Sequence, residues 1–131
     1  MSDKIGDGFT LIEVLVAIVI LTVGLLGMAS MTGVIIRGNK LSNDLTTATT
    51  LAQDKMEDIR RLGYSGTPTS DTTVTENYNS ISDYAAYKRV TVTDVYTSGT
   101  TWPPSGMKDI TVTVYWDSDR HSVELKTSLA Q

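Results

Sequence analysis

The sequence contains no cysteine, one histidine, one phenylalanine and three prolines in 131 residues. The absence of cysteine excludes a disulfide framework and a thiolate site, although a domain with a sufficient core can be exported without a disulfide. His121 has no second ligand of the usual kind nearby in the sequence, so neither a zinc site nor a catalytic triad is supported. No glycine motif for phosphate or dinucleotide binding occurs. We therefore expect a protein that is not an enzyme and carries no cofactor.

Positive charge is also scarce, with 11 Lys and Arg against 15 Asp and Glu. A chain of this balance has no general attraction for nucleic acid or for anionic lipid, and no nucleic-acid partner is expected. Asp117 and Asp119 lie close together in sequence, but two carboxylates fall short of the oxygen ligands that calcium prefers. We therefore expect no metal site.

Ionisable side chains are nearly absent from the long apolar run between Phe9 and Ile36, where Glu13 is the single exception. This run is long enough to cross a bilayer, which takes about 20 mostly apolar residues. A carboxylate at the centre of an inserted helix costs about 2.5 to 3.5 kcal/mol. Glu13 is therefore expected either to lie in water at the headgroup boundary or to have a partner.

Residues 8–14 read Gly-Phe-Thr-Leu-Ile-Glu-Val, after a short polar leader and before the apolar run. This segment resembles the cleavage and methylation signal of type IV prepilins and type II secretion pseudopilins. The resemblance implies that a prepilin peptidase cuts after Gly8 and methylates the new amino terminus, Phe9. It also implies that Glu13 neutralises the amino-terminal charge of a neighbouring subunit during assembly. The energetics agree, because a buried ion pair costs far less than either charge alone.

The leader, residues 1–8, differs from a conventional secretory signal, because the apolar run behind it is too long and no small-residue cleavage site closes that run. Its single cation, Lys4, also makes it less basic than the usual prepilin leader. We expect it to face the cytoplasm, since the peptidase of the family works on that side. The expected location is the bacterial inner membrane, with a single pass and a periplasmic carboxy-terminal domain, and then a pilus or pseudopilus.

Beyond Arg37, apolar residues recur every three or four positions, which predicts an amphipathic helix. The predicted stripe consists of Leu41, Leu45, Ala48, Ala52, Lys55 or Met56, Ile59 and Leu62. Gly63 is a plausible terminator. The sequence thus predicts one helix from about Phe9 to Leu62, with residues 9–36 in the membrane or filament core and residues 37–63 packed on a domain.

Two parts of this helix have low helix propensity. Gly24 and Gly27, with Thr22 and Ser30 nearby, either allow close helix packing in lipid or let the segment stretch in a fibre. The threonines at positions 46, 47, 49 and 50 are poor helix formers and make local fraying or kinking possible.

Residues 64–131 are predicted to form a globular domain. Its first part, residues 64–87, is a long polar connection, in which Tyr78, Tyr84 and Tyr87 are candidates for partner contact or, alternatively, cover the edge of the core. Alternation then predicts strands over residues 88–96, 109–116 and 122–129, the last two joined by a turn at residues 117–120. The expected fold is α+β: a long helix packed on an antiparallel sheet of three or more strands, which is the pilin fold.

Several later motifs also resemble the minor pilins of the PilV type and minor pseudopilin I of type II secretion. They are Gly24 to Gly27, residues 52–60, the Val-x-Val-x-Trp end of one strand and residues 123–127. The resemblance implies a minor subunit that assembles into or initiates a type IV pilus or related fibre. Its partners would be other pilin or pseudopilin subunits, a prepilin peptidase and an inner-membrane assembly platform. The alternatives are a type II secretion pseudopilin and a membrane-tethered binding domain that never polymerises.

Overall fold

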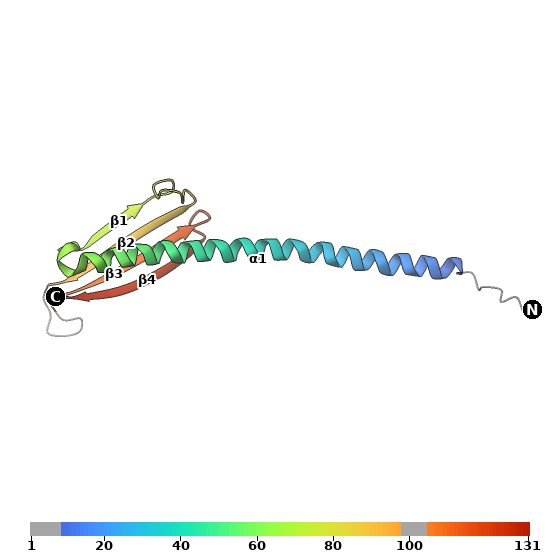
Figure 1. The fold of residues 1–131 in the computed structure, drawn as a ribbon, viewed down its shortest axis with the longest axis horizontal. Coiled ribbons are helices and arrows are strands. Elements are labelled where there is room, and N and C mark those ends of the chain that lie inside the picture. The colour runs from blue at the N-terminus through green and yellow to red at the C-terminus, as the bar shows by residue number, and fades with distance from the viewer. Residues whose placement is uncertain (1–8, 98–104) are drawn as a thin grey trace, which may run out of the picture. The chain divides into compact units, whose positions relative to one another are not determined.

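The computed structural model describes residues 9–97 and 105–131. Its described elements are one helix, α1 (Leu11–Gly66), and the strands β1 (Thr72–Glu76), β2 (Tyr87–Tyr96), β3 (Met107–Trp116) and β4 (His121–Ala130) (Figure 1). The chain divides into two units, one ending at Leu41 and the other covering Ser42–Gln131. A long apolar helix with an antiparallel sheet confirms the predicted α+β, pilin-like fold.

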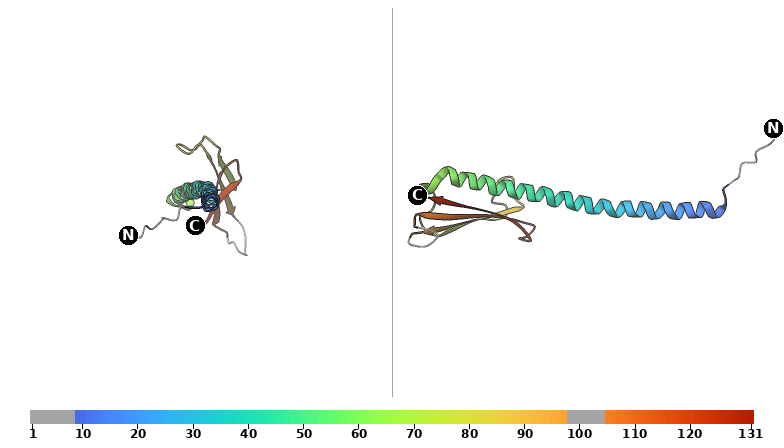
Figure 2. Two further views of the ribbon diagram at one scale, coloured as in Figure 1. Left: turned by 90° about the vertical axis from the view of Figure 1, so that its right-hand side faces the viewer. Right: turned by 90° about the horizontal axis from the view of Figure 1, so that it is seen from below.

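The second unit is a sheet covered on one face by the carboxy-terminal half of α1 (Figure 2). The helix buries Ala48, Leu51, Ala52, Met56 and Ile59, whose spacing of three and four places them on one face. The predicted stripe was too long at both ends, because Leu41, Leu45 and Leu62 are 48%, 47% and 60% exposed. These three leucines are not part of the buried core.

The four neighbouring threonines of α1 do not break the helix. Each hydroxyl donates to the carbonyl oxygen four residues earlier, at distances of 2.8 to 3.0 Å. The polar atom that makes threonine compete with the helix is thereby satisfied within the helix itself.

The helical path is interrupted at Gly63, which has φ 65° and ψ −173°. This conformation belongs to a region that is essentially restricted to glycine. The predicted role of Gly63 as terminator is confirmed, although one further turn continues α1 to Gly66.

The sheet is a meander in which every neighbouring pair of strands is antiparallel, in the order β1-β2-β3-β4. On β3, Ile110, Val112, Val114 and Trp116 are all buried against the helix, as the alternation predicts. The turn between β3 and β4 is also confirmed. Asp117, Ser118 and Asp119 adopt positive φ angles of 55° to 64°, which acidic and small polar residues tolerate better than most.

Strand β1 was not predicted and was assigned to the long polar connection. The signal for it is the run of β-branched residues Thr72, Thr73, Val74 and Thr75. The polar composition concealed this run, because four of the five strand residues are threonine or glutamate.

The side chains of strand β2 that face the helix are not its valines, although the alternation of valines predicts that they would be. Thr91 and Thr93 are buried, whereas Val90 and Val92 lie on the other face and are only partly buried. The same alternation points Tyr87 and Arg89 toward α1, where both contact helix carbonyls: Tyr87 Oη donates to Asp44 O and Arg89 Nη1 to Leu51 O. The hydrogen bonds of these two side chains therefore decide which face of the strand meets the helix, and they override the hydrophobic pattern.

Candidate functional site

The amino-terminal segment begins with a capped helix. Thr10 precedes α1, and its Oγ1 accepts a hydrogen bond from the Glu13 N–H at 3.3 Å, while its carbonyl oxygen accepts from the N–H groups of Glu13 and Val14. Thr10 is therefore the N-cap, and Glu13 occupies the position three residues on, where a capping box places an acidic residue. This local role of Thr10 and Glu13 was not predicted, although Thr-x-x-Glu before an apolar run is its signal.

Phe9 and Glu13 lie one helical turn apart at this end of the chain. Phe9 is 83% exposed, and Glu13 lies in the first turn of α1, where a negative charge is favoured by the helix dipole. Gly8 and the rest of the leader lie outside the described residues. The structure thus places the two described residues of the candidate processing site at an exposed helix start.

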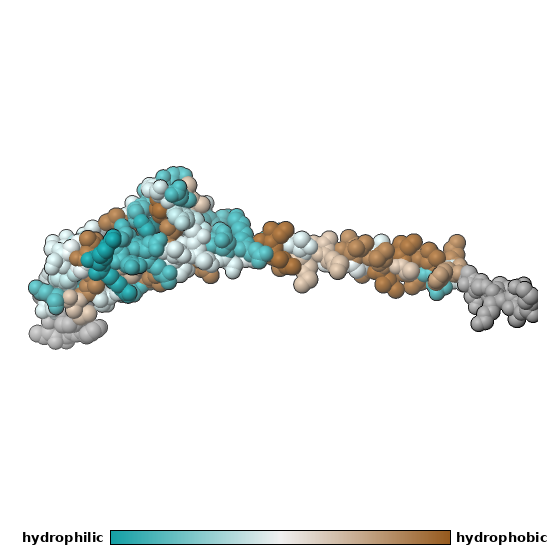
Figure 3. All heavy atoms as spheres, in the orientation of Figure 1, coloured by the Kyte–Doolittle hydropathy of each residue, from teal (hydrophilic) through white to brown (hydrophobic). Residues whose placement is uncertain are grey.

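The apolar surface of the first unit is uncovered. Every residue from Phe9 to Asn43 is exposed, and Figure 3 shows the brown, hydrophobic surface of this part of the helix. Within the part of the chain that the structure describes, α1 is the one helix long and apolar enough to cross a membrane. An apolar surface of this length requires lipid or other protein segments around it, because water around it is unfavourable.

Polar atoms inside the apolar segment are satisfied locally. The hydroxyls of Thr22, Ser30 and Thr32 donate to helix carbonyls at 2.8, 2.8 and 3.1 Å. Gly24 and Gly27 have open space around them. This arrangement suits a segment surrounded by hydrocarbon, where an unpaired polar group is costly.

The three candidate contact tyrosines have different environments. Tyr87 is 8% exposed and belongs to the core, so its ring is covered by its own domain. Tyr84 is 39% exposed and packs edge-on against Tyr87, with ring centroids 6.3 Å apart. Tyr78 is partly buried and is bonded to the turn between β3 and β4. Of the three, Tyr84 is the most exposed.

The connection after β1 is fastened to the β3–β4 turn through Asp119. Tyr78 Oη donates to Asp119 Oδ1 at 2.8 Å and accepts from the Asp119 N–H at 3.0 Å. Lys88 Nζ also pairs with Asp119 and lies 4.6 Å from the Tyr115 ring centre. The hydrogen bond from Lys88 lowers the pKa of Asp119, and desolvation together with Asp119 raises the pKa of Tyr78. This network holds residues 77–86 against the end of the sheet.

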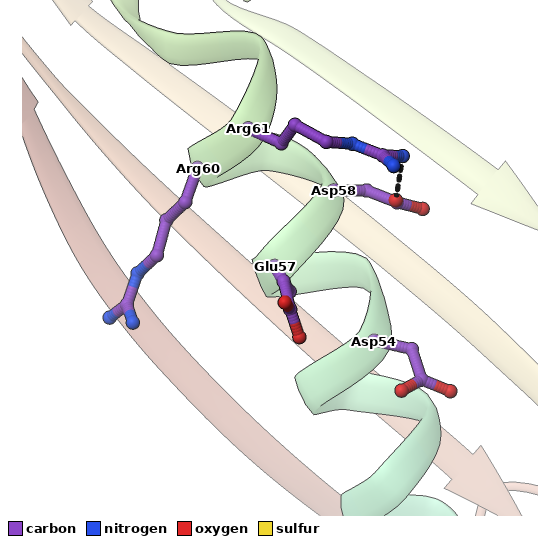
Figure 4. A pocket seen from close by; sticks show the side chains of 5 residues that line it. All are labelled: Asp54, Glu57, Asp58, Arg60 and Arg61. Atoms are coloured by element: carbon purple, nitrogen blue, oxygen red, sulfur yellow. Dashed lines mark hydrogen bonds and ion pairs between the residues drawn. The ribbon is translucent and has the colours of Figure 1, made fainter.

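The outer surface of α1 in the second unit carries a shallow groove lined by charges of both signs, formed by Asp54, Glu57, Asp58, Arg60 and Arg61 (Figure 4). Arg61 Nη2 pairs with Asp58 at 2.6 Å, whereas Arg60 points the other way and reaches Thr127 of β4. All five residues lie on one helix, and the groove is open to solvent. This arrangement is that of a solvated helix face.

The described residues contain no group of three or more His, Cys, Asp and Glu placed to hold a metal ion. His121 stacks on Trp116 with ring centroids 5.5 Å apart, and its Nε2 lies 3.9 Å from Asp117 Oδ2. The histidine therefore covers the end of the core.

Comparison with known families gives a match at the amino-terminal end of the chain. Residues 7–29 match the model described as the prokaryotic N-terminal methylation motif. This range contains Gly8, Phe9 and Glu13 and covers the first part of the apolar helix. No curated protein matches the chain. No solved structure matches it either.

Proposed function

We propose, from the amino-terminal motif of a type IV prepilin-like family, that the chain is a minor pilin or pseudopilin that assembles into or initiates a type IV pilus or related fibre. The motif implies processing by a prepilin peptidase and assembly with other pilins. The proposed steps are cleavage after Gly8, N-methylation of Phe9, and transfer of the apolar helix from the membrane into the fibre. An inner-membrane assembly platform is the further partner that this pathway requires.

The observation that carries the proposal is the motif match on a helix whose first part, up to residue 43, leaves all of its apolar side chains exposed. In this proposal residues 9–36 span the inner membrane before assembly, residues 1–8 face the cytoplasm and residues 64–131 fold in the periplasm. Residues 37–63 connect the two as the amphipathic half of the helix. The polar surface of the second unit is consistent with an aqueous compartment.

Glu13 is proposed to pair with the methylated amino terminus of a neighbouring subunit. In the free chain it lies at an exposed helix start, where water solvates it. Once the apolar segments pack together, water is excluded, and an unpaired carboxylate would carry a desolvation cost of several kcal/mol. An amino terminus from a neighbour provides a charge of opposite sign for it.

Two other functions fit the same parts. In a type II secretion pseudopilin, the subunit would help push exported proteins outward. In a membrane-tethered binding domain, the apolar helix would anchor the second unit without polymerisation, and Tyr84 would be the strongest candidate for partner contact. Partner contact through Tyr78 or Tyr87 would require opening the contacts described above.

The first test is the intact mass and amino-terminal sequence of the protein recovered from its native membrane. A chain that begins at N-methylated Phe9 is expected. Retention of residues 1–8 in cells with an active prepilin peptidase would contradict the proposal and favour the tethered domain.

A second test uses the processed protein. Glu13→Ala should abolish incorporation into fibres, whereas a tethered domain would be unaffected. Glu57→Ala, an exposed carboxylate of the same helix, serves as the matched control.

A further inference from the structure

Both edges of the sheet are open in the described residues, because β1 and β4 each pair with a neighbour on one side only. Proteins usually guard such edges with short strands, bulges or inward-pointing charges. Strand β1 has five residues and an inward-pointing Glu76. Strand β4 has ten residues, no proline and an unbroken register with β3 from His121 to Ala130. The β4 edge, which carries Glu124 and Lys126, is therefore the longer and more regular of the two.

The hydrogen-bond pattern shows which groups are free on β4. The Gln131 N–H donates to the Gly106 carbonyl oxygen at 3.1 Å, and these residues lie opposite each other when the β3–β4 register is continued. Bonded and non-bonded pairs alternate in an antiparallel ladder. The odd-numbered residues of β4 therefore bond to β3, and the even-numbered ones direct their N–H and C=O groups outward.

The same reasoning applies to the β1 edge. The Val95 N–H donates to Asp71 Oδ1 at 2.8 Å, on the β1 side of β2, whereas the Tyr96 carbonyl oxygen accepts from Gly106 on the β3 side. The odd-numbered residues of β2 thus bond to β1. In the β1–β2 register, these residues pair with Thr72, Val74 and Glu76. The N–H and C=O groups of β1 that point outward therefore belong to Thr73 and Thr75.

The free groups of both edges belong to residues on the same face of the sheet. Glu76 on β1 and Leu125 on β4 point toward the α1 side, where they contact Arg89 and the core. By alternation, Thr73 and Thr75 on β1 and the even-numbered residues of β4 point to the opposite face. Two copies can therefore join β4 to β1 in one continuous sheet, with both helices on one side.

Strand direction favours pairing of β4 with β1 over pairing of β4 with a second β4. Neighbouring strands are antiparallel throughout, so β1 and β4 run in opposite directions. Copies in the same orientation therefore bring β4 of one against β1 of the next in antiparallel fashion. Antiparallel pairing of two β4 strands would require one copy to be inverted. Chains anchored in one membrane by the same segment share one orientation, and this step rests on the proposed function.

We propose that β4 of one copy pairs with β1 of a second copy, with Val123 opposite Val74. In this register Lys126, which pairs with Asp109 in its own chain, faces Asp71, and His121 faces Glu76, which pairs with Arg89 in its own chain. Neither position brings two like charges together. Val74 is 46% exposed and is the one large apolar side chain of the described strands that is strongly exposed. Pairing covers it with a valine.

Disulfide trapping tests this register, because the chain has no cysteine of its own. Thr75 and Ser122 are exposed and would lie opposite each other in a hydrogen-bonded pair, with Cα atoms about 5.5 Å apart. This separation suits a disulfide. Within one chain the two strands are about 14 Å apart, since two strands lie between them, so any bond must join two copies.

The experiment uses the full-length chain in its native membrane under mild oxidation. Cells that express Thr75→Cys and Ser122→Cys as separate chains should yield disulfide-linked dimers, and the double variant should yield a ladder of larger species. Neither single variant should dimerise alone. Thr75→Cys with Ser128→Cys is the matched control. It is displaced by six residues, or about 20 Å, and should yield at least about tenfold less product.

The readouts separate the pairing from the proposed function. Absence of the in-register product, or equal yield from the displaced pair, overturns the pairing. Dimers formed by Ser122→Cys alone also overturn it, since they indicate contact between two β4 strands. The amino terminus is determined in the same samples. A chain that begins at Phe9 without the in-register product leaves the proposed function standing, whereas an unprocessed chain that forms this product supports the pairing and contradicts that function.

Discussion

The Arg89–Glu76 pair joins the short β1 strand to both the sheet and the helix. Arg89 Nε and Nη2 donate to the two carboxylate oxygens at 2.6 and 2.8 Å, and Nη1 donates to the Leu51 carbonyl oxygen at 3.1 Å. The hydrogen bonds from Arg89 lower the pKa of Glu76, against an opposing effect of burial. A charge-assisted, two-pronged contact of this kind is stronger than an ordinary surface ion pair.

Glu76→Gln should therefore lower the free energy of unfolding by about 1 to 2 kcal/mol at neutral pH. A depressed pKa means that the stabilisation is present above the unfolded-state value and is lost as pH falls through the folded-state value. The difference between the two proteins should thus shrink as the pH falls below about 4.5. Urea unfolding at several pH values measures it, with the exposed Glu57→Gln as control. A difference that persists in acid would contradict this account.

Lys108 is the most unusual buried residue of the sheet, at 1% exposure. Its Nζ donates to the Tyr64 carbonyl oxygen at 2.6 Å and to the carbonyl and hydroxyl oxygens of Thr67 at 3.1 Å, and it lies 4.0 Å from the Tyr64 ring centre. The ammonium group thereby satisfies oxygen atoms just beyond the Gly63 break. It fastens the end of α1 to β3.

Lys108→Met keeps the length of the side chain but removes the ammonium donor from the two Thr67 oxygen atoms, while the Tyr64 carbonyl oxygen keeps its hydrogen bond from the Thr67 hydroxyl. We expect the free energy of unfolding to fall by about 1 to 3 kcal/mol, because unsatisfied buried acceptors are costly. Lys126→Met, on the outer face of β4 with its side chain 57% exposed, should change stability by less than about 0.5 kcal/mol. Thermal unfolding followed by near-ultraviolet circular dichroism measures both. Equal stability of the two variants would contradict the anchoring role.

Among the elements, α1 depends on a single backbone conformation at Gly63. No atom lies within 4 Å of the position that a side chain would occupy there, so a substitution costs backbone strain and little else. Gly63→Ala and Gly63→Asn should each lower stability by about 1 to 3 kcal/mol. Asparagine should give no relief, because the ψ of −173° is far from the left-handed helical region that it tolerates.

Chemical unfolding of the two Gly63 variants beside Gly38→Ala measures this effect. Gly38 lies in a regular part of the helix with open space around it, so alanine there should be neutral or slightly stabilising. Full stability of Gly63→Asn would show that this position adopts left-handed helical geometry instead.

Periodicity predicted the elements whose packing follows their hydrophobic pattern. The part of α1 from Ala48 to Ile59 and strands β3 and β4 belong to this group, since their apolar positions pack in or against the core. The pattern failed where polar contacts decide the packing. Thr91 and Thr93 are buried because Arg89 on the same strand bonds to the helix, and Lys108 is buried because it finds oxygen partners far away in sequence.

The residues of the candidate site also fall into two groups: those recognised by a local sequence signal and those whose contacts lie far away in sequence. The amino-terminal motif was predicted and matches a known family model, because its signal is a local string of residues, whereas the role of Glu13 stays a prediction. For Tyr78 and Tyr87, covering the edge of the core was one of the two predicted alternatives. Their hydrogen-bond partners, Asp119 and the Asp44 carbonyl oxygen, were not predicted, because they lie 41 and 43 residues away in sequence. Short-range patterns carry no information about such partners.

The whole molecule consists of two units with opposite surface character. The first exposes apolar side chains along its length, whereas the second buries its apolar residues in its own core. All core residues lie at or beyond Ala48, so the second unit contains the complete set of contacts that hold its sheet to the helix. Its stability should not require the membrane segment.

A chain that starts at Arg37 should therefore be a soluble, folded α+β monomer. Pairing of β4 with the five-residue β1 of another copy is too short to persist in dilute solution and needs the high local concentration that a shared membrane provides. Circular dichroism and sedimentation measure folding and mass. A second chain that starts at Ala52 lacks the buried Ala48 and Leu51 and should lose cooperative unfolding. Aggregation or disorder of the Arg37 chain would contradict the independence of the second unit.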